Sequence, residues 1–185
     1  MDQNKKEIRV AVSTAALTQA INVANEFGNK RTGGLIVGFY GDEGMTAYIT
    51  EMMPPPPDSE HSELEFVRGT EGLREYIQKL WEREPKRYYL GEWHTHVPGA
   101  TAPDLQDAET MLGIAKDKEE GLPEPILVIF AMLDGVWRPS VYVALDGHLI
   151  CFSLERDGLD CWTFGLTKPD GDKANNSTNV EKEEG

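Results

Sequence analysis

Short apolar runs bounded by glycine, proline and acidic residues recur along the chain, and they predict a series of β-strands. The turns between them are clear, because Asp134-Gly135 and Asp146-Gly147 are favoured in tight hairpins. A hairpin is also expected around residues 41–44. Strands are predicted over residues 7–12, 33–40, 45–52 and 88–96, and over three runs after Pro123 with the sequences ILVIFAML, WRPSVYVAL and LICFSLE.

Three other segments space their apolar residues as a helix does. The first is TAALTQAINVANEF, with Ser13 or Thr14 as its cap and Gly28 at its end. The others lie over residues 70–84 and 104–118. Four prolines, Pro54 to Pro57, open a segment expected to be an extended loop. This order predicts an α+β fold, a mixed β-sheet with a few helices.

Length and composition indicate one domain with a short tail. A chain of 185 residues with 39% apolar residues can bury a core. Residues 1–166 are expected to form the domain, and residues 167–185, rich in Asn, Lys, Glu and Asp, a disordered acidic tail. No apolar run approaches the roughly 20 residues of a membrane span, and the first residues lack the apolar core of a signal peptide. A cytoplasmic protein is therefore expected, with Cys151 and Cys161 as free thiols.

The net charge of −14 limits the partners. An acidic surface repels nucleic-acid phosphates and anionic lipids, so neither nucleic acid nor a membrane is expected as a partner. The same charge suits a basic protein partner, and it also suits plain solubility.

The segment GEWHTHVPGATAPDLQD, residues 91–107, carries the strongest candidate chemistry. On a strand, His94 and His96 point to the same face, and Asp107 follows in the first turn of the next helix. Two imidazoles and a carboxylate are a common catalytic zinc arrangement, because three ligands leave one position open for water. The alternative is structural, because Asp104 and Asp107 have the spacing of a helix cap and its partner.

Two other enzyme classes with histidine pairs are excluded. A (β/α)₈ barrel needs about 250 residues, more than this chain has. A zinc deaminase needs a PCxxC-like cysteine pair, which the sequence lacks.

With these residues in hand, the chain resembles the JAMM (MPN-plus, JAB) zinc metalloproteases. His94-Thr95-His96, ten further residues and Asp107 match the spacing of that family's motif. RTGGLIVG (31–38) is similar to its glycine-bearing strand, and GEWHTH to its bacterial branch. The resemblance extends from about residue 7 to residue 155.

The resemblance implies an MPN/JAB-like (cytidine-deaminase-like) mixed sheet flanked by helices. It implies zinc bound by His94, His96 and Asp107. It also implies an isopeptidase or peptidase that cleaves after the C-terminus of a ubiquitin-like protein or its conjugate. Some bacterial members of the family serve in anti-phage systems.

Two positions depart from the family pattern. Arg31 stands where the family has its catalytic glutamate, and a guanidinium has no acceptor for a proton. Asp104 stands where the family usually has a serine that helps hold the oxyanion, and an ionised carboxylate would repel that charge. Asp104 suits a helix cap instead.

Glu92, two residues before His94, is the best local candidate for a replacement base. It can equally orient His94 or lie in solvent. Glu43 and Glu51 are interpreted as ordinary solvated acids.

The leading hypothesis is therefore a zinc-dependent isopeptidase whose base is displaced from its usual place. Its rival is a catalytically inactive binding module that holds zinc or a ubiquitin-like tail. A third hypothesis is a peptidase for a sulfur-carrier or small peptide adduct, acting through the same site.

Overall fold

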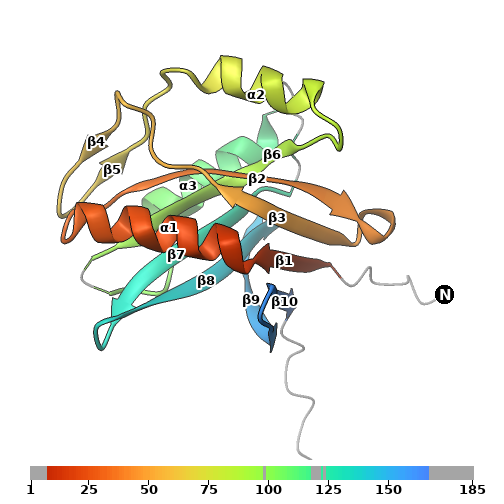
Figure 1. The fold of residues 1–185 in the computed structure, drawn as a ribbon. Helices are drawn as coiled ribbons and strands as arrows, with labels where there is room; N and C mark the ends of the chain where they lie inside the picture. The colour runs from red at the N-terminus through yellow and green to blue at the C-terminus, as the bar shows by residue number, and fades with distance from the viewer. Residues whose placement is uncertain (1–7, 98, 118–121, 123, 167–185) are drawn as a thin grey trace, which may run out of the picture.

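A computed structural model describes residues 8–97, 99–117, 122 and 124–166 (Figure 1). Strands and helices alternate in the first two thirds, and four consecutive strands complete the fold. The elements are β1 (Arg9–Ser13), α1 (Thr14–Phe27), β2 (Gly33–Gly41), the 3₁₀ turn η1 (Asp42–Gly44), β3 (Thr46–Met52), β4 (Glu60–His61), β5 (Phe66–Val67), α2 (Leu73–Glu82), β6 (Tyr88–His96), α3 (Leu105–Lys116), β7 (Ile126–Leu133), β8 (Val136–Leu145), β9 (His148–Asp157) and β10 (Cys161–Leu166).

The main sheet closes on itself as a barrel in the order β1-β10-β9-β8-β7-β6-β2-β3. β1 pairs parallel to β3 and antiparallel to β10, which joins the two ends of the sheet. β6 and β7 also pair in parallel, and the other neighbours are antiparallel. β4 and β5 form a separate two-stranded hairpin. The predicted mixed α+β architecture is confirmed. The closure of the sheet into a barrel is not predicted from the sequence.

Two features differ from the sequence-based expectation. CWTFGL (161–166) is not among the predicted strands, yet it forms β10 between β1 and β9. The segment after the four prolines is not loop throughout, because Glu60 and His61 pair with Val67 and Phe66. Both strands depend on partners distant in sequence.

Helix α1 covers one side of the barrel beside β1 and β3 (Figure 1). The Ser13 hydroxyl accepts a hydrogen bond from the Ala16 N–H at 3.1 Å, and Gly28 follows the last turn with φ of 62°. Its small buried face, Ala16, Leu17, Ala20 and Ala24, lets the helix lie close to the sheet. The predicted caps and extent of this helix are confirmed.

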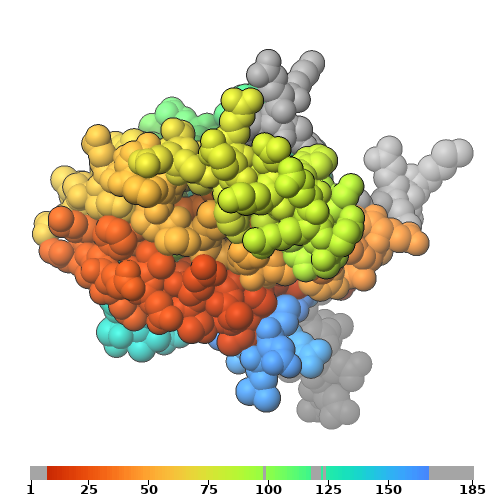
Figure 2. All heavy atoms as spheres, turned by 45° about the horizontal axis from the view of Figure 1, so that its top comes forward, coloured from red at the N-terminus to blue at the C-terminus, as the bar shows by residue number. Residues whose placement is uncertain are grey.

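The two other helices lie elsewhere on the sheet. α3 packs against β8 and β9, where its Met111 joins Leu127, Ile129 and Tyr142 in a second apolar cluster. α2 is close to β6 but buries only Leu80. In Figure 2, α2 is the yellow-green ridge beside the gold segment of β4 and β5. No helix in the described part of the chain is long and apolar enough to cross a membrane.

Gly34 lies where β2 meets the chain after β3, and a side chain has no room there. A Cβ at this position would lie 2.1 Å from the Met53 carbonyl oxygen. We expect Gly34→Ala to lower the free energy of unfolding by about 2–3 kcal/mol, because the backbone must shift. Gly113→Ala, on an exposed turn of α3 with nothing within 4 Å, should instead raise it by about 0.5–1 kcal/mol. Chemical denaturation of both variants measures the difference, and equal stabilities would contradict this account.

Candidate metal centre

The C-terminal end of β6 carries both histidines on one face. Their ring centroids are 5.0 Å apart, and Thr95 between them points to the opposite side, where it is fully buried. The Thr95 hydroxyl accepts a hydrogen bond from the Thr32 N–H at 2.9 Å. This bond extends the β2–β6 pairing past Gly33, which lies opposite His94. The strand alternation predicted for His94 and His96 is confirmed.

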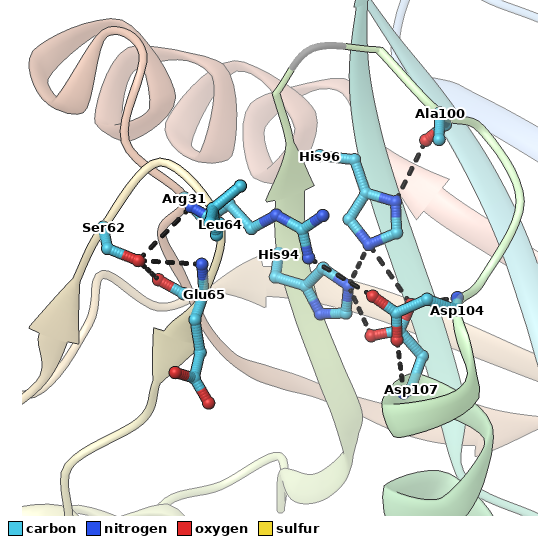
Figure 3. Close-up of polar contacts among 9 residues, drawn as sticks. All are labelled: Arg31, Ser62, Leu64, Glu65, His94, His96, Ala100, Asp104 and Asp107. Carbon is cyan, nitrogen blue, oxygen red and sulfur yellow. Dashed lines mark hydrogen bonds and ion pairs between the residues drawn. The ribbon is translucent and has the colours of Figure 1, made fainter.

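Asp107 reaches the histidines from the first turn of α3. Its backbone N–H donates to Asp104 Oδ1 at 2.9 Å, and its own Oδ2 accepts from the Asp104 N–H at 2.7 Å. These two bonds are a capping box that starts the helix. The structural and chemical interpretations of this spacing therefore hold together, because the cap orients the Asp107 carboxylate toward the histidines (Figure 3).

The three side chains converge at distances that suit one ion. The two Nε2 atoms are 3.1 Å apart, Asp107 Oδ1 lies 3.1 Å from His94 Nε2, and Oδ2 lies 3.2 Å from His96 Nε2. Ligands at about 2.0–2.1 Å from a tetrahedral ion are separated by roughly 3.3 Å. With one atom from each residue, all lie within 4.8 Å of one another. The group can hold a metal ion.

The orientation of His96 is fixed by the loop after β6. His96 Nδ1 lies 3.1 Å from the Ala100 carbonyl oxygen, and a ring N–H donated there leaves the Nε2 lone pair for the site. The Tyr142 hydroxyl donates to the Thr101 carbonyl at 2.8 Å and secures the same loop. His96 itself is 1% exposed. A partner of this kind is typical of metal-binding histidines.

Asp107 is ionised at neutral pH. Burial by itself raises the pKa of a carboxyl, but the close polar contacts with the imidazoles of His94 and His96 outweigh it. The pKa of Asp107 therefore lies well below its ordinary value. An ionised carboxylate is the form that binds a cation.

Arg31 extends across this group toward Asp104 (Figure 3). Its Nη1 donates to Asp104 Oδ2 at 3.3 Å, so the two residues that depart from the family pattern form an ion pair with each other. The backbone of Arg31 is held by the β4–β5 hairpin, through the Ser62 carbonyl at 2.7 Å and His61 Nδ1 at 3.0 Å. His61 is itself stacked on Phe27 rather than simply exposed on the surface.

Glu92 lines the same pocket as His94 but is already paired. Its Oε1 accepts from Arg68 Nε and Nη2, each at 3.0 Å, and lies 3.4 Å from the Tyr89 hydroxyl. A catalytic role for Glu92 remains a prediction. Glu51 accepts from the Tyr76 hydroxyl at 2.7 Å, and neither Glu51 nor Glu43 lines the pocket.

The pocket lined by His94 and Asp107 has a volume of about 240 Å³, and His96 is buried behind it. Two ion pairs flank it, Arg31 with Asp104 and Arg68 with Glu92. Glu65, after the hairpin turn, also lines the pocket, and its carboxylate has no partner among the described residues. No sequence signal points to Glu65 or Arg68, because only the pairing of β4 with β5 brings them to this pocket.

A larger cleft of about 930 Å³ lies beside this pocket, between α2 and the strands β2 and β6. Arg68 lines both cavities, so the two are neighbours. The cleft is mainly apolar and aromatic, with Tyr40, Leu73, Ile77, Trp81 and Tyr88 among its walls.

Comparison with known proteins finds two similar bacterial proteins. The chain is 32% identical over 120 residues to a CD-NTase/cGAS isopeptidase of Enterobacter hormaechei subsp. hoffmannii. The alignment covers 65% of this chain and 66% of the relative, so the chain spans just under two thirds of the relative's length. The chain is also 24% identical over 123 residues to a probable metalloprotease, y4qB, of Sinorhizobium fredii. That alignment covers 65% of this chain and 74% of the relative. The chain is similar to these bacterial isopeptidases and metalloproteases, in agreement with the JAMM resemblance. The names of these relatives, an isopeptidase and a probable metalloprotease, agree with the predicted enzyme class, a hydrolase of the metallopeptidase type.

The fold also has a solved counterpart outside these two relatives. The solution structure of protein DSY2949 from Desulfitobacterium hafniense superposes with a TM-score of 0.54 at 14% identity, over 77% of this chain and 88% of that one. At this identity the likeness concerns the fold alone. No protein-family model matches the chain.

Proposed function

We propose that this chain is a zinc-dependent isopeptidase that cleaves after the C-terminus of a ubiquitin-like protein or its conjugate. The observation that carries the proposal is the convergence of His94, His96 and Asp107 in a pocket. The name of the Enterobacter relative, a CD-NTase/cGAS isopeptidase, supports a protein conjugate as the substrate. We also propose a role in an antiviral system, on the JAMM resemblance alone.

His94, His96 and Asp107 would hold the ion and leave a fourth position open. When bound, zinc would polarise the scissile carbonyl and acidify water in the pocket. The residues of the chain set the geometry: the Ala100 carbonyl orients His96, and the capping box orients Asp107.

Proton transfer is the step that this chain supports least. Arg31 cannot accept a proton, and the carboxylates of Asp104 and Glu92 are each paired with a guanidinium. Loss of a general base costs about 10²–10⁴ in rate, so we propose a slow enzyme with the full metal site.

The Arg31–Asp104 ion pair also supports a second candidate. A module that binds zinc and a ubiquitin-like tail without cleaving it needs no base, and this pair occupies both departures from the catalytic pattern. Turnover of a fusion substrate distinguishes the two.

We further propose an MPN/JAB-like fold for residues 1–166, a disordered tail over residues 167–185 and a cytoplasmic location. The last described element, β10, ends at Leu166, and residues 167–185 lie outside the described residues.

The experiment that tests this function is elemental analysis joined to a cleavage assay. The purified chain should carry about one zinc ion, and it should slowly cleave a ubiquitin-like fusion at the end of the ubiquitin-like part. A chain with zinc and no cleavage on any such fusion would support the binding module. A neighbouring gene for an E1-like or E2-like ligase would favour conjugates over small peptide adducts.

The cleft beside the pocket should contact the protein part of the substrate. Trp81 is 56% exposed at its wall and packs edge-on against Tyr88 at 5.4 Å. Because exposed tryptophans often dominate protein interfaces, Trp81→Ala should raise KM for a protein fusion about tenfold or more with little change in kcat. Leu159→Ala is the matched control, since Leu159 is 95% exposed in the turn before β10 and does not line the cleft. An unchanged KM in Trp81→Ala would remove the cleft from substrate binding.

A further inference from the structure

Arg31 has more hydrogen-bond donors than its surroundings accept. Nη1 donates to Asp104, but Nε is buried and has no acceptor among the described residues. Nε lies on the edge of the guanidinium that can bind a carboxylate side-on with two parallel bonds. A buried donor of a charged group without a partner is unfavourable, and an incoming acceptor would relieve it.

The existing pair with Asp104 does not lock the guanidinium. It consists of one contact of 3.3 Å between side chains that are 23% and 44% exposed. Exposed pairs of this kind contribute little to stability. The backbone of Arg31, by contrast, is fixed by Ser62 and His61 of the hairpin. The backbone of Arg31 is therefore fixed, and a single long contact holds its guanidinium.

Arg68, the other cation of the pocket, is different. Its Nε and Nη2 both donate to Glu92 Oε1, and its Nη1 donates to the Gly69 carbonyl at 3.2 Å. All three of its nitrogens are thus in use. Of the two arginines in this pocket, Arg31 is the one that can take a new anion.

The position of Arg31 beside the metal ligands specifies the anion. Arg31, His94, Asp104 and Asp107 line one pocket of about 240 Å³, which has room for only about two small amino-acid residues. A carboxylate in this pocket can face the ion held by His94, His96 and Asp107 with one side and the Arg31 fork with the other. A neutral amide offers one acceptor oxygen and carries no charge.

We propose that this pocket binds the free C-terminal carboxylate of a protein chain that ends in small residues, with Arg31 as its donor. The inference rests on the proposed function, because it uses the same pocket with its ion in place. Hydrolysis of an amide bond leaves such a carboxylate on the acyl product. Arg31 therefore makes the site retain a cleaved C-terminus and recognise one that is already free.

The test is a calorimetric titration of the zinc-loaded full chain with acetyl-glycylglycine and, separately, with its C-terminal amide. Mass spectrometry checks that both peptides stay intact. The acid should bind about tenfold or more tightly than the amide, because only the acid pairs its charge with the guanidinium. Arg31→Gln should lose most of the preference for the acid, with an unchanged zinc content and melting temperature. Arg138→Gln, at an exposed position of β8 that lines neither cavity, should keep the preference for the acid.

Equal binding of acid and amide by the parent chain would overturn the proposal, as would no binding of either at millimolar concentration. It would also fall if Arg31→Gln kept the full preference for the acid. These results do not depend on turnover. A chain that prefers the acid and cleaves no fusion keeps the carboxylate site and loses the isopeptidase. A chain that cleaves fusions and does not prefer the acid keeps the isopeptidase and loses the carboxylate site.

Discussion

Replacing His94 with alanine, or Asp107 with asparagine, should reduce the zinc content from about one ion per chain to a small fraction. Each change removes one of three converging ligands, and the two that remain cannot surround an ion with the protein alone. Any peptidase activity should fall to background with the metal. Asparagine is chosen at Asp107 because its amide oxygen can still accept the Asp104 N–H bond that starts α3. The measurements are elemental analysis and fusion cleavage on parent and variants.

His148→Ala is the matched control for the histidine variant. His148 is exposed at the start of β9 and belongs to no candidate metal group among the described residues. Its loss should leave the zinc content and the activity unchanged. If His94→Ala and Asp107→Asn keep stoichiometric zinc, these residues are not the ligands. A parent chain without zinc would contradict the metal site as a whole.

Sequence alone could predict the metal group because its determinants are local. His94 and His96 share a face by strand alternation, and Asp107 follows from a helix start eleven residues later. The apolar runs and the caps of α1 are local signals of the same kind. For this reason the amino-acid pattern suffices to predict most of the strands, the main helices and the three converging side chains.

The rest depends on contacts between distant segments. Arg31 and Asp104 are 73 residues apart, and Arg68 and Glu92 are 24 apart, so neither ion pair has a spacing signal. β10 becomes a strand because β1 and β9 provide it with two partners. Both departures from the family pattern could be named from the sequence. The ion pair between Arg31 and Asp104 could not be predicted from the sequence, and it changes how either residue should be mutated.

Arg31→Glu alone is expected to restore activity only in part. The guanidinium now faces Asp104 Oδ2 at 3.3 Å, so a glutamate in its place would bring two carboxylates together. Like charges at this distance raise the pKa of one partner or drive the side chains apart. Either outcome misplaces the new proton acceptor or keeps it protonated.

The double variant Arg31→Glu/Asp104→Ser removes that conflict. Serine keeps a good helix cap at position 104, and it restores the hydroxyl that the JAMM resemblance implies there. If the rest of the site is competent, kcat/KM on a ubiquitin-like fusion should rise by about 10²–10⁴ over the parent, the usual contribution of a general base. The single Arg31→Glu variant should gain about tenfold less than the double variant, because the repulsion it retains amounts to about 1 kcal/mol or more. Zinc content should be the same in all of them.

Three further variants show which residue is responsible for the activity. Arg31→Gln removes the cation without adding an acceptor, and Asp104→Ser removes the repelling carboxylate alone, so neither should reach the double variant. Glu92→Gln in the parent background tests the other candidate base: if Glu92 already works, the parent is active and this change abolishes the activity. A double variant that stays inactive on every ubiquitin-like fusion while carrying full zinc would end the hypothesis of a recoverable enzyme. The binding module would then be the function that the Arg31–Asp104 pair serves.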